Sequence, residues 1–150
     1  MTTIGSICER DVICTNSETT VQAAAKLMRR YHVGALVIVD DAAGRRMPKG
    51  IVTDRDIVVE VAALDLDPNV ITVGDIAMPE LVTVREVEGV LETIELMRLR
   101  GVRRLPVVGE GGELVGIVSV DDLLETMSEQ MSEMTRALGR ERGHEFQARR

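Results

Sequence analysis

Two short segments carry a hydroxyl side chain followed three residues later by an aspartate, each directly after an apolar run. They are residues 50–56, Gly-Ile-Val-Thr-Asp-Arg-Asp, and residues 116–122, Gly-Ile-Val-Ser-Val-Asp-Asp. The apolar residues are typical of a strand, and the hydroxyl is placed to begin a helix. A helix start presents unpaired N–H groups and a partial positive charge, which stabilise an anion such as phosphate. An ionised Asp accepts hydrogen bonds and suits the two hydroxyl donors of a sugar diol.

Helix capping is the competing interpretation of both segments. Thr53 with Asp56, and Ser119 with Asp122, have the spacing of a capping box, in which a hydroxyl caps the helix and an acidic residue stands at its third position. Capping alone explains either pair. The occurrence of the motif twice favours a ligand role at one or both copies, and both interpretations remain open on the residues alone.

The two segments belong to a longer internal repeat. Residues 3–7 correspond to residues 72–76, and Met28 corresponds to Met97 at the same offset. Beyond the loop 40–49 the offset is shorter, because Gly50 corresponds to Gly116, so the first copy has three extra residues in that loop. A unit of some 60 residues is marginal alone, so the two copies are expected to pack on each other.

Hydrophobic periodicity predicts the order β-α-β-β-α in each copy. For copy one we expect strands at 12–14, 35–39 and 47–52, a helix opened by a Thr19–Gln22 capping box, and a helix from Thr53 to about Ala63. For copy two we expect strands at 81–83, 104–108 and 113–118, a helix bearing Val90, Ile94 and Met97, and a helix from Asp121. The fold class is α/β (α+β), with unit 1 at 1–63, a linker at 64–71, unit 2 at 72–127 and a helical extension at 128–150.

The last helix is expected to continue past the repeat. Its apolar residues alternate at spacings of three and four, which is a heptad seam that needs an apolar partner; they are Leu124, Met127, Met131, Met134 and Leu138. Gly139 and Gly143 weaken the helix beyond them. Two interpretations stay open: the helix folds back on its own domain, or it forms a homodimer contact.

Composition argues against several classes of function. The formal net charge is −7 and the aromatic content 1%, so the chain repels polyanions and lacks platforms for stacking bases, and we expect no nucleic-acid partner. The N-terminus has no signal-peptide pattern and no stretch reaches the length of a membrane span, which indicates a cytoplasmic protein without membrane contact. Two cysteines and two histidines form no metal pattern, and the sequence shows no catalytic set or Gly-rich phosphate loop. We therefore expect no metal and no enzymatic activity.

The doubled unit, each copy ending in Gly-Ile-Val-(Thr/Ser)-x-x-Asp, resembles the cystathionine-β-synthase (CBS) domain pair, or Bateman module, over residues 4–127. The layout is similar to small stand-alone bacterial two-CBS proteins. The resemblance implies two units with pseudo-twofold symmetry and two clefts that bind AMP, ADP or ATP, with S-adenosylmethionine, NAD or cyclic dinucleotides as alternatives. It implies a non-enzymatic regulatory module that signals to an effector protein, with no obligatory cofactor. A ligand-independent homodimeric scaffold is the alternative.

The same resemblance assigns roles to the two motifs. Thr53 and Ser119 would contact phosphate or ribose oxygens, and Asp56 and Asp122 would accept hydrogen bonds from ribose hydroxyls. Arg55, on the first turn of its helix, is a further candidate in copy one, although a solvent-facing arginine is common at such a position.

An arginine also follows the first helix in the family pattern, where it tends to reach phosphate. Arg103 and Arg104 match that pattern, and an arginine fork can grip phosphate bidentately. Copy one has Gly34 and Ala35 at these positions. We therefore expect unequal clefts, with the tighter grip in copy two.

Overall fold

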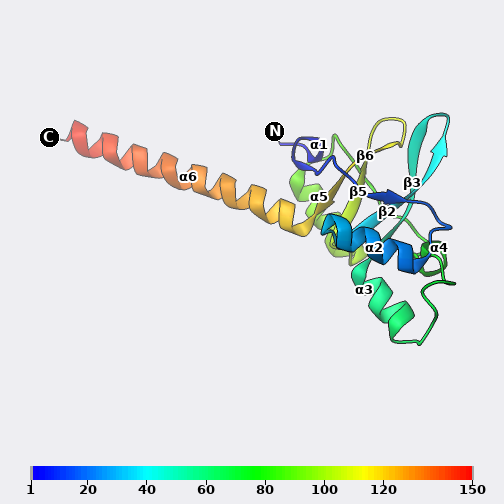
Figure 1. Ribbon diagram of the computed structural model, residues 1–150. Coiled ribbons are helices and arrows are strands. Elements are labelled where there is room, and N and C mark those ends of the chain that lie inside the picture. The colour runs from blue at the N-terminus through cyan, green and yellow to red at the C-terminus, as the bar shows by residue number, and fades with distance from the viewer. Residues whose placement is uncertain (1, 150) are drawn as a thin grey trace.

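The computed structural model describes residues 2–149 as a mixed α and β domain from which one long helix projects (Figure 1). In chain order the elements are α1 (Ile4–Ile7), β1 (Cys14–Thr15), α2 (Val21–Tyr31), β2 (Ala35–Ala42), β3 (Arg45–Thr53), α3 (Asp54–Ile57), the π-helix η1 (Val58–Ala62), α4 (Val73–Ile76), β4 (Val84–Arg85), α5 (Val90–Arg100), β5 (Arg104–Val108), β6 (Leu114–Ser119) and α6 (Val120–Ala148). The predicted order of elements in each repeat is confirmed.

Each repeat forms its own three-stranded sheet. The strand orders are β1-β2-β3 and β4-β5-β6, and in both sheets the first pair is parallel and the second antiparallel. The antiparallel registers correspond, because Ala35 pairs with Thr53 and Arg104 pairs with Ser119. Each sheet therefore places the hydroxyl residue of the motif opposite the first residue of the preceding strand.

The two repeats exchange their N-terminal segments. Ile4 N donates to Glu88 O at 2.9 Å, so α1 docks on the second sheet unit, and Val73 N donates to Thr19 O at 2.8 Å, so α4 docks on the first. The glycine after each donor repeats the exchange, because Gly74 N donates to Ser17 O at 3.0 Å and its counterpart Gly5 N donates to Glu86 O at 2.8 Å. The two units thus hold each other through matching contacts, as pseudo-twofold symmetry requires.

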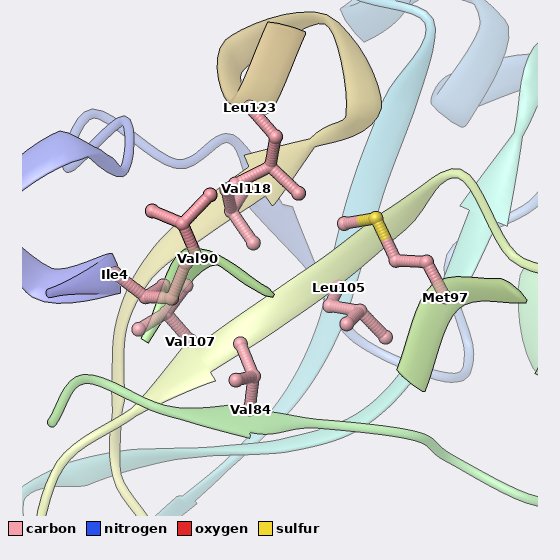
Figure 2. Close-up of a cluster of buried hydrophobic side chains, with 8 residues drawn as sticks. All are labelled: Ile4, Val84, Val90, Met97, Leu105, Val107, Val118 and Leu123. Atoms are coloured by element: carbon pink, nitrogen blue, oxygen red, sulfur yellow. The ribbon is translucent and has the colours of Figure 1, made fainter. Parts of the chain in front are cut away.

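Each unit has an aliphatic core that includes a residue of the exchanged segment. In the second unit Ile4 is fully buried against Val107 and Val118 from the sheet, with Met97 of α5 and Leu123 of α6 in the same cluster (Figure 2). In the first unit Val73 is fully buried with residues of α2, β2 and β3. Because each core is completed by the other repeat, neither unit keeps its core if the two separate.

Several local predictions were wrong for identifiable reasons. Thr20, and not Thr19, caps α2 by accepting from Ala23 N at 3.1 Å, because Thr19 contributes its carbonyl to the exchanged segment. The short strands lie at 14–15 and 84–85 instead of 12–14 and 81–83, since only these residues pair with the neighbouring strand.

The loop predicted at 40–49 is mostly strand. Strands β2 and β3 continue as a hairpin. It turns at Ala43 and Gly44, whose φ angles are 53° and 78°. Positive φ at both positions suits a two-residue hairpin turn.

The helix that begins after Thr53 ends at Ala62, close to the predicted end at Ala63. Its second half, η1, has π-type hydrogen bonds such as Ala63 N to Val58 O at 2.9 Å.

Helix α6 does not fold back on its domain. It runs unbroken over 29 residues, through Gly139 and Gly143, and points away from both sheets (Figure 1). Residues 128–149 are exposed throughout, and Gln130 Nε2 donates to Thr2 Oγ1 at 3.4 Å near the point where the helix leaves the domain. The fold-back interpretation is therefore wrong.

Candidate functional site

Both motifs form complete capping boxes. At the start of α6, Asp122 N donates to Ser119 Oγ at 3.2 Å and Ser119 N donates to Asp122 Oδ2 at 2.9 Å. Thr53 and Asp56 repeat this geometry at α3, with 3.1 Å and 2.9 Å. The structure therefore contains the caps that the competing interpretation requires.

A third capping box occurs away from the two motifs. Thr72 and Asp75 at the start of α4 exchange hydrogen bonds of 3.2 Å and 2.9 Å. The bond from the backbone N–H of Thr72 lowers the pKa of the exposed Asp75 carboxyl below its ordinary value. This third box is a capping box of the same chemistry at a different place, and it is a natural control for the other two.

The cap at α6 leaves binding capacity on both of its side chains. Ser119 Oγ is an acceptor in the cap, so its own O–H hydrogen can still be donated. Asp122 uses Oδ2 in the cap, and Oδ1 takes no part in that bond. Both side chains are only partly buried. Capping and ligand binding are thus compatible functions of the same pair of residues.

A cleft lies between the repeats beside this cap, and we call it the Ser119 cleft. It has a volume of about 190 Å³ and is lined from the second repeat by Arg104, Ser119 and Asp122, together with Ile117. Its opposite wall is Val33, Gly34 and Ala35, from the turn after α2 and the first residue of β2 in the first repeat. Three of the predicted site residues therefore meet in one cleft.

A second cleft occupies a corresponding position beside the first repeat, and we call it the Ile51 cleft. It has a volume of about 180 Å³, and Ile51, Val102 and Arg104 are among its lining residues. The repeat offsets carry Ile51 onto Ile117, and carry Val33 and Ala35 onto Val102 and Arg104. The lining of this cleft includes Gly50, Leu81 and Val82 and does not include the Thr53–Asp56 cap.

Arg104 lines both clefts. Its side chain reaches the first repeat at Gly34, where an added Cβ would lie 3.2 Å from Arg104 Nη2 and 3.1 Å from Asp54 Oδ2. A larger residue at Gly34 would displace these two charged groups. The glycine of copy one, which in sequence is the counterpart of Arg103, is thus what admits Arg104 between the repeats.

The remaining predicted residues are placed differently. Arg55 and Arg103 are exposed and do not line either cleft. The carbonyl of Arg103 instead accepts from Val120 N at 2.9 Å, as the carbonyl of Gly34 accepts from Asp54 N at 3.0 Å.

Sequence reasoning missed the walls that the opposite repeat supplies, Val33 and Gly34 above all. In the repeat alignment Val33 corresponds to Val102, and Gly34 corresponds to Arg103, the first residue of the arginine pair. The alignment could therefore have indicated these walls.

The two thiols are separate and partly buried. Burial raises the pKa of both Cys8 and Cys14. At Cys14 the effect of burial on the pKa outweighs that of Arg46, whose positive charge lowers it and whose Nη1 lies 3.3 Å from the Cys14 sulfur. Raised pKa values keep both groups in the thiol form near neutral pH. Over residues 2–149, no group of three or more His, Cys, Asp and Glu side chains is arranged to hold a metal ion.

The chain belongs to the CBS domain family, because the family model for the CBS domain matches residues 4–63 and 73–129. It is 38% identical over 129 residues to Hypoxic response protein 1 of Mycobacterium tuberculosis, a match that covers 86% of this chain and 87% of that protein. It is also 38% identical over 123 residues to an uncharacterized protein of Methanopyrus kandleri, and there it spans 61% of the relative's length. The resemblance seen in the sequence is confirmed.

Solved structures of CBS domain pairs share the fold. A Pyrobaculum aerophilum CBS domain protein complexed with AMP is 26% identical, with a TM-score of 0.73 over 81% of this chain and 89% of that one. A CBS domain pair in complex with 5′-methylthioadenosine and S-adenosyl-L-methionine is 25% identical, with a TM-score of 0.73 over 84% of this chain and 99% of that one. The predicted fold, two CBS units with a C-terminal helix, is confirmed.

Among the helices of the described chain, residues 2–149, none combines the length and the apolar character needed to cross a membrane.

Proposed function

We propose that this chain is a non-enzymatic regulatory module that binds an adenosine-containing ligand, with AMP, ADP or ATP foremost, between its two CBS units and signals occupancy to an effector protein. The Ser119 cleft carries the proposal. It joins a cation, a hydroxyl donor and a carboxylate from one repeat to an apolar wall from the other. Structural neighbours that hold AMP, or 5′-methylthioadenosine with S-adenosyl-L-methionine, support an adenosyl ligand.

Each group in the cleft suits one part of such a ligand. The Arg104 guanidinium can grip a phosphate bidentately, and the Ser119 O–H can donate a further hydrogen bond to a phosphate or ribose oxygen. Asp122 Oδ1 can accept from ribose hydroxyls while Oδ2 keeps the cap intact. Val33, Ala35 and Ile117 offer apolar surface to the base.

The size of the cleft suggests how occupancy reaches a partner. The Ser119 cleft has a volume of about 190 Å³. Ordinary ligand pockets begin at roughly 300 Å³, so a complete nucleotide would widen this cleft. Widening moves the wall at Val33 relative to the second repeat. A ligand that favours the wider packing shifts the equilibrium between the two arrangements, and an effector that distinguishes them can read the shift.

We further propose that the two clefts differ in affinity, with the Ser119 cleft the tighter. Arg104 is shared between the clefts, while the residue that corresponds to it in copy one is Ala35, which supplies no charge. A phosphate held by Arg104 in one cleft therefore leaves less positive charge for the other. The other charged residues that line the Ile51 cleft are Arg100 and Glu80, which pair with each other at 3.0 Å, so further polar contacts at the weaker site would have to come from Thr53, Asp56 and Arg55, which stand outside its lining.

Isothermal titration of the full chain with AMP, ADP, ATP, NAD, S-adenosylmethionine and a cyclic dinucleotide tests the proposal. We expect saturable binding of at least one adenine nucleotide, with one strong site per chain. If the chain binds S-adenosylmethionine and does not bind AMP, the proposed ligand changes but its adenosyl class stays. Absence of binding by the whole set would refute the proposal. The cytoplasmic location stays a prediction.

A further inference from the structure

Arg104 is the cation that the two clefts have in common. Over residues 2–149, the lining of the Ser119 cleft contains no other positively charged residue. The lining of the Ile51 cleft also contains Arg100, but Arg100 Nη1 lies 3.0 Å from Glu80 Oε1 and is held in that ion pair. A phosphate in either cleft would therefore have to be held chiefly by the same guanidinium.

The side chain of Arg104 crosses from one repeat to the other. Its backbone pairs with Ser119 in the second sheet, and its chain neighbours Val102 and Leu105 line the Ile51 cleft. At the far end, Arg104 Nη2 reaches Gly34 of the first repeat, where an added Cβ would lie 3.2 Å from it. Gly34 lines the Ser119 cleft. One side chain thus starts beside one cleft and ends beside the other.

The first repeat supplies no matching side chain from its own side. Ala35 is the sequence counterpart of Arg104, and it lines the Ser119 cleft without any charge. Pseudo-twofold symmetry would provide one arginine at this position for each cleft. This chain provides one arginine for two clefts.

A single guanidinium can serve one phosphate fully. Its planar fork grips one phosphate through two parallel N–H bonds, and this geometry is used up by that one partner. A second phosphate that shared the fork would stand close to the first, and their negative charges would repel each other. Loss of a hydrogen bond to a charged group weakens a dissociation constant roughly 10- to 150-fold.

We propose that Arg104 couples the two clefts negatively, so that AMP bound in one cleft lowers the affinity of the other for a second AMP. The coupling rests on the proposed function, because it takes AMP as a ligand of the Ser119 cleft. A phosphate in that cleft engages the guanidinium, and a second AMP then binds roughly 10- to 150-fold more weakly than it would to an empty chain. The effect is reciprocal between the clefts.

Two isoleucine methyl groups report the clefts separately. Ile117 lines the Ser119 cleft and Ile51 lines the other, so methyl NMR of the full chain during titration with AMP gives one isotherm for each cleft. Replacing both Ser119 and Asp122 by alanine weakens AMP binding in the Ser119 cleft and leaves Arg104 in place. The Ile51 isotherm should then move to roughly 10- to 150-fold lower AMP concentration. Independent clefts would not show this gain.

The matched control replaces both Thr72 and Asp75 by alanine. This pair forms a capping box of the same geometry and lines neither cleft, so its loss should leave both isotherms unchanged. Melting curves establish that each variant is folded at the temperature of the titration. Ser119→Ala alone, which keeps the carboxylate of Asp122, should move the Ile51 isotherm in the same direction and replaces the double variant if that one does not fold.

Adding Arg104→Ala to the variant with the disabled Ser119 cleft tests whether the gain depends on this arginine. The Ile51 isotherm should return to its wild-type position. Arg103→Ala in the same background removes an equal charge one residue away, from a side chain that lines neither cleft, and should preserve the gain.

The outcomes separate the coupling from the proposed function. AMP shifts at Ile117 with an Ile51 isotherm that gains no affinity when the Ser119 cleft is disabled would overturn the coupling and leave the proposed function standing. A gain that survives Arg104→Ala, or one that Arg103→Ala abolishes, would also overturn the coupling. Absence of AMP shifts at both methyl groups in the wild type would refute AMP as the ligand, and the coupling would fall with it.

Discussion

Replacing Ser119 by alanine separates its capping of α6 from its proposed role in ligand binding. The variant loses the Oγ acceptor that caps α6 at Asp122 N, and it loses the O–H donor that faces the Ser119 cleft. Loss of an N-cap hydroxyl costs about 1 kcal/mol, which for a chain of this size lowers the melting temperature by about 2–4 °C. Loss of a hydrogen bond to a charged phosphate costs about 1.5–3 kcal/mol, or a roughly 10- to 150-fold weaker AMP dissociation constant.

The matched control is Thr72→Ala. Thr72 accepts from Asp75 N at 3.2 Å, the same length as the bond from Asp122 N to Ser119, and it lines neither cleft. Its loss should lower the melting temperature by a similar amount and leave AMP affinity unchanged. Thermal melts give the first quantity, and isothermal titration well below both melting temperatures gives the second.

The comparison can refute the assignment directly. If Ser119→Ala melts like Thr72→Ala and binds AMP as the wild type does, Ser119 is a cap and the site is misplaced. Thr53→Ala extends the test to copy one. There the Thr53 cap is present, but Thr53 and Asp56 do not line the Ile51 cleft. We expect a loss of stability there with a smaller loss of affinity.

Three further predictions concern other residues. Arg104→Ala should weaken AMP binding roughly 10- to 150-fold and adenosine binding little, because only AMP carries the charge it grips, and equal losses by titration would contradict this. Gly74→Ala should lower the melting temperature, since its Cβ would lie 2.7 Å from the Ser17 carbonyl oxygen, whereas Gly139→Ala, with open space around it, should not. Burial raises the pKa of Cys8 and Cys14, so their contribution to stability is present below the ordinary thiol pKa and is lost as pH rises through the folded values. Alkylation at about pH 8 should accordingly be slower in the folded protein than in denaturant, and equal rates would count against this account.

The sequence alone was sufficient for the elements whose signals are local. Strand β5 spans Arg104–Val108, the bounds that the apolar run predicts, and both motif hydroxyls cap helices as their spacing indicates. Local signals suffice in these places because the side-chain period and the capping geometry involve residues within one or two turns. The repeat added the order of elements and the expectation that two units pack together.

Tertiary structure decided the features that join distant residues. The exchange of α1 and α4, the transfer of the α2 cap from Thr19 to Thr20, and the passage of Arg104 to Gly34 all depend on contacts between the repeats. No periodicity encodes such contacts. The spacing in residues 116–122 therefore determined a capped helix start, whose cap leaves the Ser119 hydroxyl hydrogen and Asp122 Oδ1 for other partners. The packing of Val33–Ala35 against this helix start, which is a tertiary contact, then formed a cleft there.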